Sequence, residues 1–255
     1  MHWDTKRRLI YAFATLFVIA TLLVISFRKV LFPDPTCVDM KQNGFETGVD
    51  CGGECALRCS AEVYPLSVLW STAVKSSEFT YDIVGLVSNK NINNASRALG
   101  YTFTAYSEKG DILDTFNGTT TAPLDGEFPI IIQNVTLSEA PFRVGMTLND
   151  TAHYKVRENP ATPTVSITNR VYEAGIVSRV YAQVKNNKQF EVRDLEVRVL
   201  LLDAKDNVFA VGTTLVPFLT REESRQISFT WNKAFEEAPT RILVYPIFSP
   251  FQVRE

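Results

Sequence analysis

The amino-acid sequence predicts an all-β protein in which two tandem antiparallel β-sandwich domains follow one N-terminal transmembrane helix and a short disulfide-rich segment. Three observations predict this layout. An apolar run without charge, proline or glycine occupies residues 9–27. All four cysteines fall between positions 37 and 59. From Tyr64 onward, short alternating or β-branched runs are separated by turn residues, and no stretch has a helical period.

The composition fits a chain that folds around hydrophobic cores. Of 255 residues, 45% are hydrophobic and 21% are charged, which predicts little disorder outside short tails and linkers. The formal net charge is -2, and no run of Lys or Arg extends beyond Lys6-Arg7-Arg8. Nucleic acid is therefore not a predicted partner.

Residues 9–27 are long enough to cross a membrane, because a helix of this length spans roughly 28 Å and the hydrocarbon core is about 30 Å thick. A buried core helix would carry a polar face, which this run lacks. A cleaved signal peptide would have a shorter apolar region followed by a site with small residues, whereas residues 26–32 read SFRKVLF. We expect an uncleaved signal-anchor that follows a cytoplasmic stub, residues 1–8.

The cysteines indicate which side of the membrane the bulk of the chain occupies. The stalk, residues 28–62, contains a Cys-rich part that is too short and too rich in glycine to bury a core. An even number of cysteines predicts two disulfides, with three pairings open. A zinc site is the alternative, but the C-x13-C-x3-C-x3-C spacing has no paired CxxC and no nearby His. The four residues are Cys37, Cys51, Cys55 and Cys59.

Disulfides require an oxidising compartment, so the C-terminal part of the chain is expected outside the cytoplasm and the N-terminus inside it. The flanking charges favour the same orientation only slightly, with three basic residues before the span and two after it. The predicted location is the cell membrane, crossed once by residues 9–27.

The stalk carries the string C-x-D-x3-N-G-x-E-x3-D-C-G-G-x-C. It resembles a small Cys-rich motif that recurs in secreted and surface proteins of bacteria, often beside β-rich domains. The resemblance implies no established activity. This copy has Met40 where a glycine often follows the first Asp, and a wider spacing between its last two cysteines.

Oxygen-bearing side chains in this string form a candidate calcium site, because Ca²⁺ takes six to eight oxygen ligands. Gly44 and Gly48 favour a loop over a helix here, and the alternating pattern of an EF-hand loop is absent. The alternative is that these side chains make Asx-type turns that cap a disulfide knot. The candidate ligands are Asp39, Asn43, Glu46 and Asp50. No other cofactor is expected.

Two β domains are predicted, at residues 63–157 and 158–255, with a polar linker around 157–162. Each has six strand candidates, and polar turns at 108–111 and 204–207 fit an antiparallel sandwich. The strand candidates are 67–74, 79–88, 99–107, 112–116, 128–135 and 142–148 in the first domain, and 165–172, 177–185, 195–203, 208–216, 225–231 and 241–248 in the second.

Internal similarity between these domains predicts a tandem duplication. Glu-Ala-Pro at 139–141 recurs at 237–239, an offset of 98, and Pro65 matches Pro163 at the same offset. The other two matches are Val-Ser-Asn at 87–89 with Val-Lys-Asn at 184–186, and the hairpin 107–112 with 203–208. Their offsets are 97 and 96, so four matches occur in order at nearly constant spacing.

Each repeat has a buried run that ends in Asn, then an alternating strand, a polar turn and an apolar strand. This pattern resembles the FxLYD-like immunoglobulin-type domains of bacterial envelope proteins. The whole layout is similar to that of membrane-anchored proteins of candidate-phylum bacteria. The resemblance implies an immunoglobulin-like fold and an envelope location, and it implies no chemistry.

No catalytic residues are predicted. The sequence has no nucleophile elbow, P-loop or dinucleotide-binding fingerprint, and its two histidines are His2 and His153. A His-based site would depend on His153 alone, which fits a linker or a strand end. The acidic pairs at 222–223 and 236–237 are expected in solvated turns. Four N-x-[ST] sequons occur, at Asn94, Asn117, Asn134 and Asn149, and the bacterial resemblance argues against their glycosylation.

The apolar runs 128–132 and 200–202 are expected to be central core strands, with a docking edge as the alternative. The predicted function is that of a membrane-anchored extracytoplasmic structural or interaction protein of the cell envelope, without catalysis. Its expected partner is another envelope protein or the cell wall. The alternative is a ligand- or calcium-binding ectodomain that acts as an accessory subunit of a membrane complex.

Overall fold

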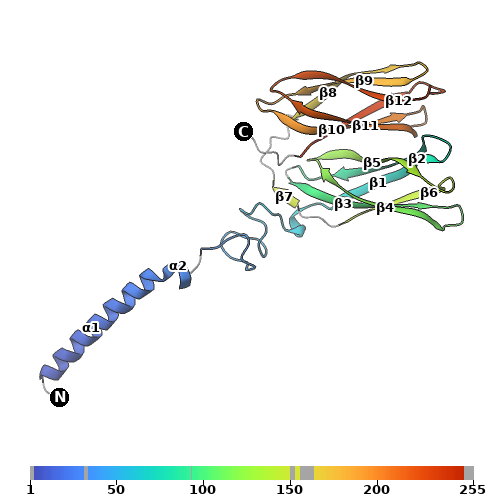
Figure 1. Ribbon diagram of the computed structural model, residues 1–255. Coiled ribbons are helices and arrows are strands. Elements are labelled where there is room, and N and C mark those ends of the chain that lie inside the picture. Colours follow the sequence, from blue (N-terminus) through green and yellow to red (C-terminus); the bar gives the residue numbers. More distant parts are fainter. Residues whose placement is uncertain (1–2, 32–33, 93, 150–152, 156–163, 250–255) are drawn as a thin grey trace. The chain divides into compact units, whose positions relative to one another are not determined.

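The computed structural model describes residues 3–31, 34–92, 94–149, 153–155 and 164–249 (Figure 1). The chain divides into two compact units, Met1–Glu54 and Cys55–Glu255. The predicted linker around 157–162 and the predicted boundary between residues 157 and 158 lie outside the described residues.

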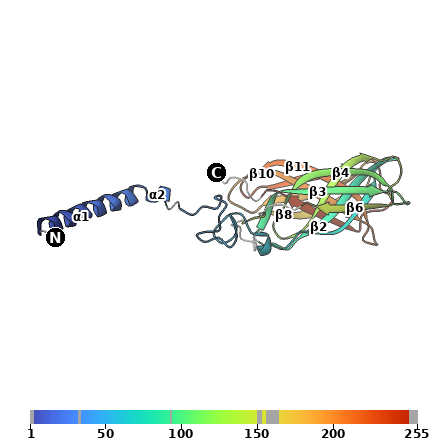
Figure 2. The ribbon, with the colours of Figure 1, turned by 90° about the horizontal axis from the view of Figure 1, so that it is seen from below.

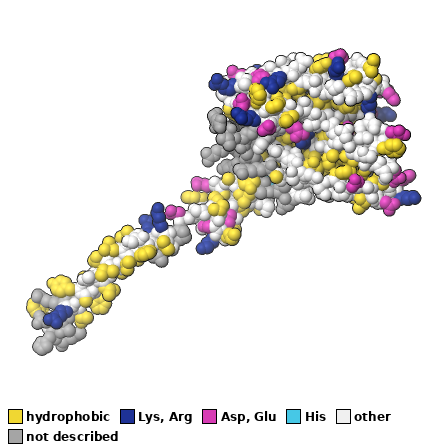
Figure 3. All heavy atoms as spheres, viewed as in Figure 1, with side chains coloured by type: hydrophobic (Ala, Val, Ile, Leu, Met, Phe, Trp, Pro, Cys, Tyr) yellow, Lys and Arg dark blue, Asp and Glu magenta, His cyan; other side chains and the backbone are white. Residues whose placement is uncertain are grey.

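The first unit begins with a long apolar helix, α1 (Trp3–Ser26), followed by the short helix α2 (Arg28–Leu31). Within α1, Arg8–Ser26 is long and apolar enough to cross a membrane, and 0% of it is buried against protein. Figure 3 shows hydrophobic side chains along the length of this helix. A core helix would be covered by protein, so α1 has the properties of a membrane anchor or of a signal sequence.

Two hydroxyl groups within the apolar span are bonded inside the helix. Thr15 Oγ1 donates to the carbonyl of Tyr11, and Thr21 Oγ1 donates to the carbonyl of Phe17, both at 2.8 Å. A hydroxyl that faces lipid needs such an internal acceptor. These threonines are therefore compatible with a membrane environment.

The described residues of the second unit form a short 3-10 helix, η1 (Ser60–Glu62), and thirteen strands. All twelve predicted strands are present. The third and fourth are longer than predicted, and a short extra strand, β7, pairs with β3. The strands are β1 (Ser67–Lys75), β2 (Thr80–Asn89), β3 (Asn94–Tyr106), β4 (Ile112–Ala122), β5 (Gly126–Thr136), β6 (Arg143–Leu148), β7 (His153–Lys155), β8 (Val165–Glu173), β9 (Ser178–Asn186), β10 (Val192–Leu202), β11 (Val208–Leu219), β12 (Ser224–Trp231) and β13 (Arg241–Ile247).

The strands pair into four antiparallel sheets. The first half of the unit contains β1-β2-β5 and β4-β3-β6, with β7 beside β3; the second half contains β12-β9-β8 and β11-β10-β13. The same order therefore occurs twice, with β8 to β13 in the places of β1 to β6. In Figure 1 the sheets form layers, and Figure 2 shows the layer with β3, β4 and β6 from below. The predicted all-β sandwich architecture is confirmed, whereas duplication and immunoglobulin-like ancestry stay predictions.

Each half of the unit, called here the first and the second sandwich, encloses its own hydrophobic core. Phe103 from β3 and Phe128 from β5 belong to the core of the first, and both are fully buried. In the second, Val180 from β9 belongs to the same buried cluster as Val197 and Leu201 from β10. Alternation along each strand sends these side chains inward, as the pattern of the sequence predicted.

A third hydrophobic cluster joins the two sandwiches. Val74 and Val84 of the first sandwich share it with Leu200, Leu202 and Val211 of the second. Strands β2 and β10 are consequently buried on both faces. A strand covered on both sides needs apolar residues at consecutive positions, which explains the continuous runs in these two strands.

The runs 128–132 and 200–202 are mostly buried, as expected, but only one of them lies in a central strand. Phe128, Ile130 and Leu200 are at most 1% exposed. Strand β10 is the middle strand of its sheet, as predicted, but β5 lies at the end of the order β1-β2-β5. Its apolar run is buried because layers on both faces cover it, so a central place in the sheet is not required.

Candidate functional site

All four cysteines, Cys37, Cys51, Cys55 and Cys59, are disulfide-bonded. This confirms the prediction of two disulfides. The zinc alternative is wrong, because zinc requires thiolates and these sulfur atoms are bonded to one another.

The carboxylates of the Cys-rich segment accept hydrogen bonds from groups within the same segment. Asp50 Oδ1 accepts hydrogen bonds from the backbone N–H groups of Asp39, at 2.9 Å, and Met40, at 3.0 Å. Asp39 in turn accepts from the N–H of Lys41 at 3.0 Å and from Nδ2 of Asn43 at 2.9 Å. The hydrogen bond from Asn43 is the main cause that lowers the pKa of Asp39. This is the arrangement of an Asx-type turn.

Several oxygen atoms of the candidate calcium ligands thus already accept hydrogen bonds from the loops that carry them. Glu46 Oε2 accepts from the backbone N–H of Asn43 at 3.2 Å. Among the described residues, the carboxylate oxygens of Asp39, Glu46 and Asp50 do not come within 4.8 Å of one another as a group of three. Asn43 Oδ1 is buried and accepts no hydrogen bond, so it is an acceptor that remains for water or a cation. Calcium binding at these residues stays a prediction.

A groove of about 630 Å³ opens where the first and second sandwiches meet. We call it the inter-sandwich groove. Its lining from the first sandwich comprises residues 74–77, Thr80, Asp82 and residues 133–134, and its lining from the second comprises residues 209–213 and 228–233. The volume falls in the range of small-molecule sites, roughly 300–1,000 Å³.

Asp82 lies in this groove because of its place on β2. The neighbouring residue Ile83 points into the core of the first sandwich, and Val84 points toward the second sandwich. Alternation puts Asp82 on the same face as Val84. The apolar contact between the sandwiches ends at Val74 and Val84, and Asp82 begins the polar lining beyond it.

A β-bulge fixes the carboxylate of Asp82. The register between β2 and β5 shifts between Tyr81 and Ile83, and Asn134 opposite adopts a positive φ of 58°. Asp82 Oδ1 accepts the backbone N–H of Asn134 at 2.9 Å. The second oxygen, Oδ2, accepts no hydrogen bond among the described residues and is open to the groove. Bulges commonly re-aim a side chain in this way.

The electrostatic setting of Asp82 is unusual for a carboxylate. The residue is only 5% exposed, and no ion pair to it occurs among the described residues. Desolvation by burial raises the pKa of Asp82, while the hydrogen bond from Asn134 and the charge of Lys233 oppose the rise. The groove therefore holds a strong acceptor that is poorly compensated by the protein itself.

The second sandwich supplies the opposite wall. Trp231 Nε1 donates to the carbonyl of Val211 at 2.9 Å, which ties β12 to β11 along the groove. Lys233 Nζ reaches the carbonyls of Lys75 and Ser76, at 3.3 and 3.4 Å, and so bridges the two sandwiches. Residues of both sandwiches are therefore needed to form the groove.

A buried arginine fixes the two sandwiches against each other at another point of the same interface. Arg198 on β10 is 5% exposed and forms a bidentate ion pair with Glu196, at 2.8 and 2.9 Å. Across the interface, its Nη1 donates to the carbonyl of Pro129 at 2.5 Å, and Nη2, which also bonds Glu196, donates to Thr120 Oγ1 at 3.0 Å. A buried guanidinium with this many partners specifies one relative arrangement of the sandwiches.

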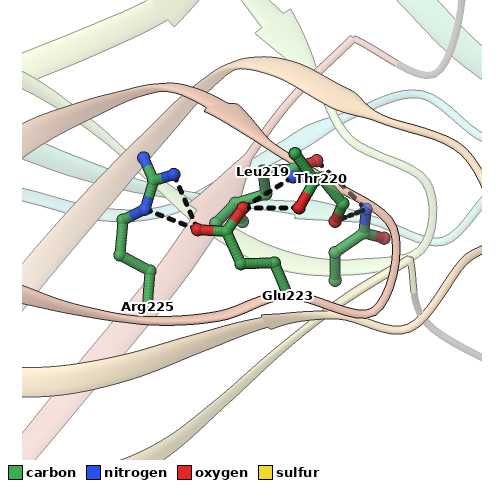
Figure 4. A network of polar contacts seen from close by, with 5 residues as sticks. Leu219, Thr220, Glu223 and Arg225 are labelled. Carbon is green, nitrogen blue, oxygen red and sulfur yellow. Dashed lines mark hydrogen bonds and ion pairs between the residues drawn. The ribbon is translucent and has the colours of Figure 1, made fainter.

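The acidic pair at 222–223 has a structural role, as expected for a turn. Glu223 Oε2 accepts from the backbone N–H and the hydroxyl of Thr220, at 2.8 and 2.9 Å, and Oε1 pairs with Arg225 at 2.6 Å (Figure 4). The hydrogen bonds from Thr220 are the main causes that lower the pKa of Glu223. This carboxylate fixes the turn between β11 and β12.

Neither Asp82 nor Arg198 was predicted as a site residue. Asp82 is the single charge in the run TYDIVGLV, and Arg198 is one of two charges, with Glu196, in the run LEVRVLLL. That pattern is a usable signal, because a charge at such a position requires a partner or a cavity. His153 lies in β7, as a strand residue, and does not line the groove.

The sequons have different settings. Asn117, Asn134 and Asn149 are exposed, and Asn94 is half-buried. Asn134 lies in the groove next to Asp82. That these residues are not glycosylated stays a prediction.

Comparison with known proteins does not assign this chain to a family. No family model and no curated protein matches the chain. Among solved structures, the chain is similar to the crystal structure of red sea bream transglutaminase, with 12% sequence identity and a TM-score of 0.24. The match covers 74% of this chain and 30% of that one. The similarity is too weak to support a functional argument.

Proposed function

We propose that this protein is a membrane-anchored interaction module of the cell envelope, with a cytoplasmic N-terminus, an extracytoplasmic second unit and no catalytic role. The observation that carries the proposal is the apolar helix α1, whose membrane-length segment has no protein cover. The oxidised cysteines support an oxidising compartment for the residues that follow it. Two β-sandwiches fixed together by a shared core would then form a rigid body that can present a binding surface.

In vivo cross-linking tests the interaction role. Cells that produce the full chain are treated with a membrane-impermeant cross-linker, and adducts are recovered under denaturing conditions. We expect discrete adducts with an envelope protein or with wall material. The matched control replaces residues 9–27 with a cleavable signal peptide, which releases the same second unit from the membrane. Absence of any adduct from the anchored chain would count against the proposal.

Calcium binding at the Cys-rich segment is the second candidate, and the orphaned acceptor Asn43 Oδ1 favours it. Calorimetric titration of the full chain with Ca²⁺ tests it, with Asn43→Ala as the variant and Asn207→Ala as a control in an exposed turn of the second unit. Heat that disappears in Asn43→Ala alone would support the site. No heat and no change in the melting temperature would remove it.

A further inference from the structure

The inter-sandwich groove has a lining of hydroxyl and amide side chains with little net charge. Serine, threonine, asparagine and glutamine side chains from both sandwiches line it, and its charged residues are Lys75, Lys233 and Asp82. Two lysines and one aspartate leave a formal charge of +1. A polyanion would be expected to bind a more basic site, and a cationic ligand would be repelled by the lysines. The lining suits a neutral ligand that carries many hydroxyl groups.

Asp82 Oδ2 is the specific feature of the groove. It is a carboxylate oxygen on a residue that is 5% exposed, and it is open to the groove without a protein donor. A carboxylate accepts hydrogen bonds and donates none, so its complement is a ligand O–H or N–H. A ligand hydroxyl at this position would make a charge-assisted hydrogen bond with Oδ2.

The wall opposite Asp82 disfavours an added peptide strand. The groove includes residues 209–213 of β11, which is the end strand of its sheet and could in principle pair with an extended chain. However, the carbonyl of Val211, in the middle of that segment, already accepts Trp231 Nε1. An added strand would lose one of its central backbone hydrogen bonds.

We propose that the inter-sandwich groove binds a neutral oligosaccharide, with Asp82 Oδ2 accepting a sugar hydroxyl at its base. Exposed side chains such as Gln133, Ser228 and Thr230 supply donors and acceptors around it. Among the described residues that line the groove, Asp82 is the only carboxylate, so this lining offers no pair of acids of the kind that most glycoside hydrolases need. The groove holds the sugar without cleaving it. This inference deepens the proposed interaction role, since it names a glycan as the partner class.

Calorimetric titration of the full chain in lipid nanodiscs tests the proposal, because sugar-headgroup detergents would compete. The probes are cellotetraose and the β-1,4-linked tetramer of N-acetylglucosamine. We expect saturable binding of at least one of them, weakened at least about tenfold in Asp82→Asn. The isosteric amide keeps an oxygen for the N–H of Asn134, so the fold is retained. The matched control is Asp114→Asn, an exposed aspartate on β4 outside the groove, which should bind like the unchanged chain.

A second variant, Gln133→Arg, obstructs the groove from an exposed position whose side chain makes no hydrogen bond among the described residues. It should also abolish binding. The proposal is overturned if neither tetrasaccharide binds at about 10 mM, or if binding survives both variants. Cross-linking to an envelope protein together with no sugar binding would overturn the glycan inference alone and leave the interaction role standing.

Discussion

Two buried asparagines hold equivalent places in the two sandwiches. Asn89 Nδ2 donates to the carbonyl of Pro123 at 2.6 Å, and Asn186 Nδ2 donates to the carbonyl of Thr220 at 2.9 Å, in each case 34 residues further along the chain. The side-chain oxygen of each accepts the backbone N–H two residues later. The shared pattern supports the predicted duplication, because it repeats contacts that are remote in sequence.

Asn186→Ala should lower the free energy of unfolding by about 2 kcal/mol or more, since it leaves buried carbonyl groups without donors. Urea denaturation measures the change. Gln226→Ala, an exposed glutamine on β12, serves as the control and should stay within about 0.5 kcal/mol. Similar losses in both variants would show that Asn186 is not a structural support.

Two arginines of β10, each paired with a glutamate, allow a matched comparison. Arg198→Ala leaves Pro129 and Thr120 without their buried donor, and we expect a loss of roughly 3 kcal/mol. Arg193 pairs with Glu191 at 2.6 Å on the same strand, but its side chain is 68% exposed, so Arg193→Ala should cost less than about 1 kcal/mol. Chemical denaturation of both variants decides the point, and a smaller loss for Arg198→Ala would contradict the assigned role.

Asp82 should make stability depend on pH. Because burial raises its pKa, the folded state disfavours the charged form that it must carry at neutral pH. This penalty is present above the raised pKa and disappears as the pH falls toward the ordinary value of 3.8. Asp82→Asn should therefore melt at a higher temperature than the unchanged chain at pH 7, and the difference should vanish near pH 4. A difference that does not depend on pH would refute the assignment.

At the scale of elements, the adjacent residues Leu200 and Leu201 face different cores. Leu200 joins the cluster shared by the two sandwiches, and Leu201 joins the core of the second sandwich alone. Leu200→Ala should weaken the coupling and separate the calorimetric unfolding of the unit into two transitions. Leu201→Ala should cost about 2–5 kcal/mol and act mainly on the second sandwich. If both variants still unfolded in a single transition, with equal decreases in melting temperature, the result would argue against a separate coupling core.

Most strands could be predicted from the sequence, because alternation and turn residues are local signals. The start of β3, residues 94–98, and the end of β4, residues 117–122, were missed, since NASRA and NGTTTA lack a clear alternation of apolar and polar residues. Strand β7 was missed for a different reason. Its three residues form a strand only because β3 offers them a partner.

At the scale of the whole molecule, the proposed topology makes a direct prediction. Protease added to spheroplasts should degrade an epitope placed after residue 255 and spare one placed before residue 1. Alkaline carbonate should leave the chain in the membrane fraction, since an apolar helix is not released by charge or salt. Lysed vesicles are the control and should lose both tags. Protection of the C-terminal tag in intact spheroplasts would reverse the topology.

The apolar helix, the oxidised cysteines and the all-β architecture were determined by the sequence alone, because each depends on the composition or period of a short segment. The tertiary structure decided how the two sandwiches meet and what lies between them. Val84 and Leu200 are 116 positions apart and share one core, and Asp82 faces a groove whose far wall begins at residue 209. Such contacts depend on the packing of whole sheets, and no local pattern specifies which faces will be joined.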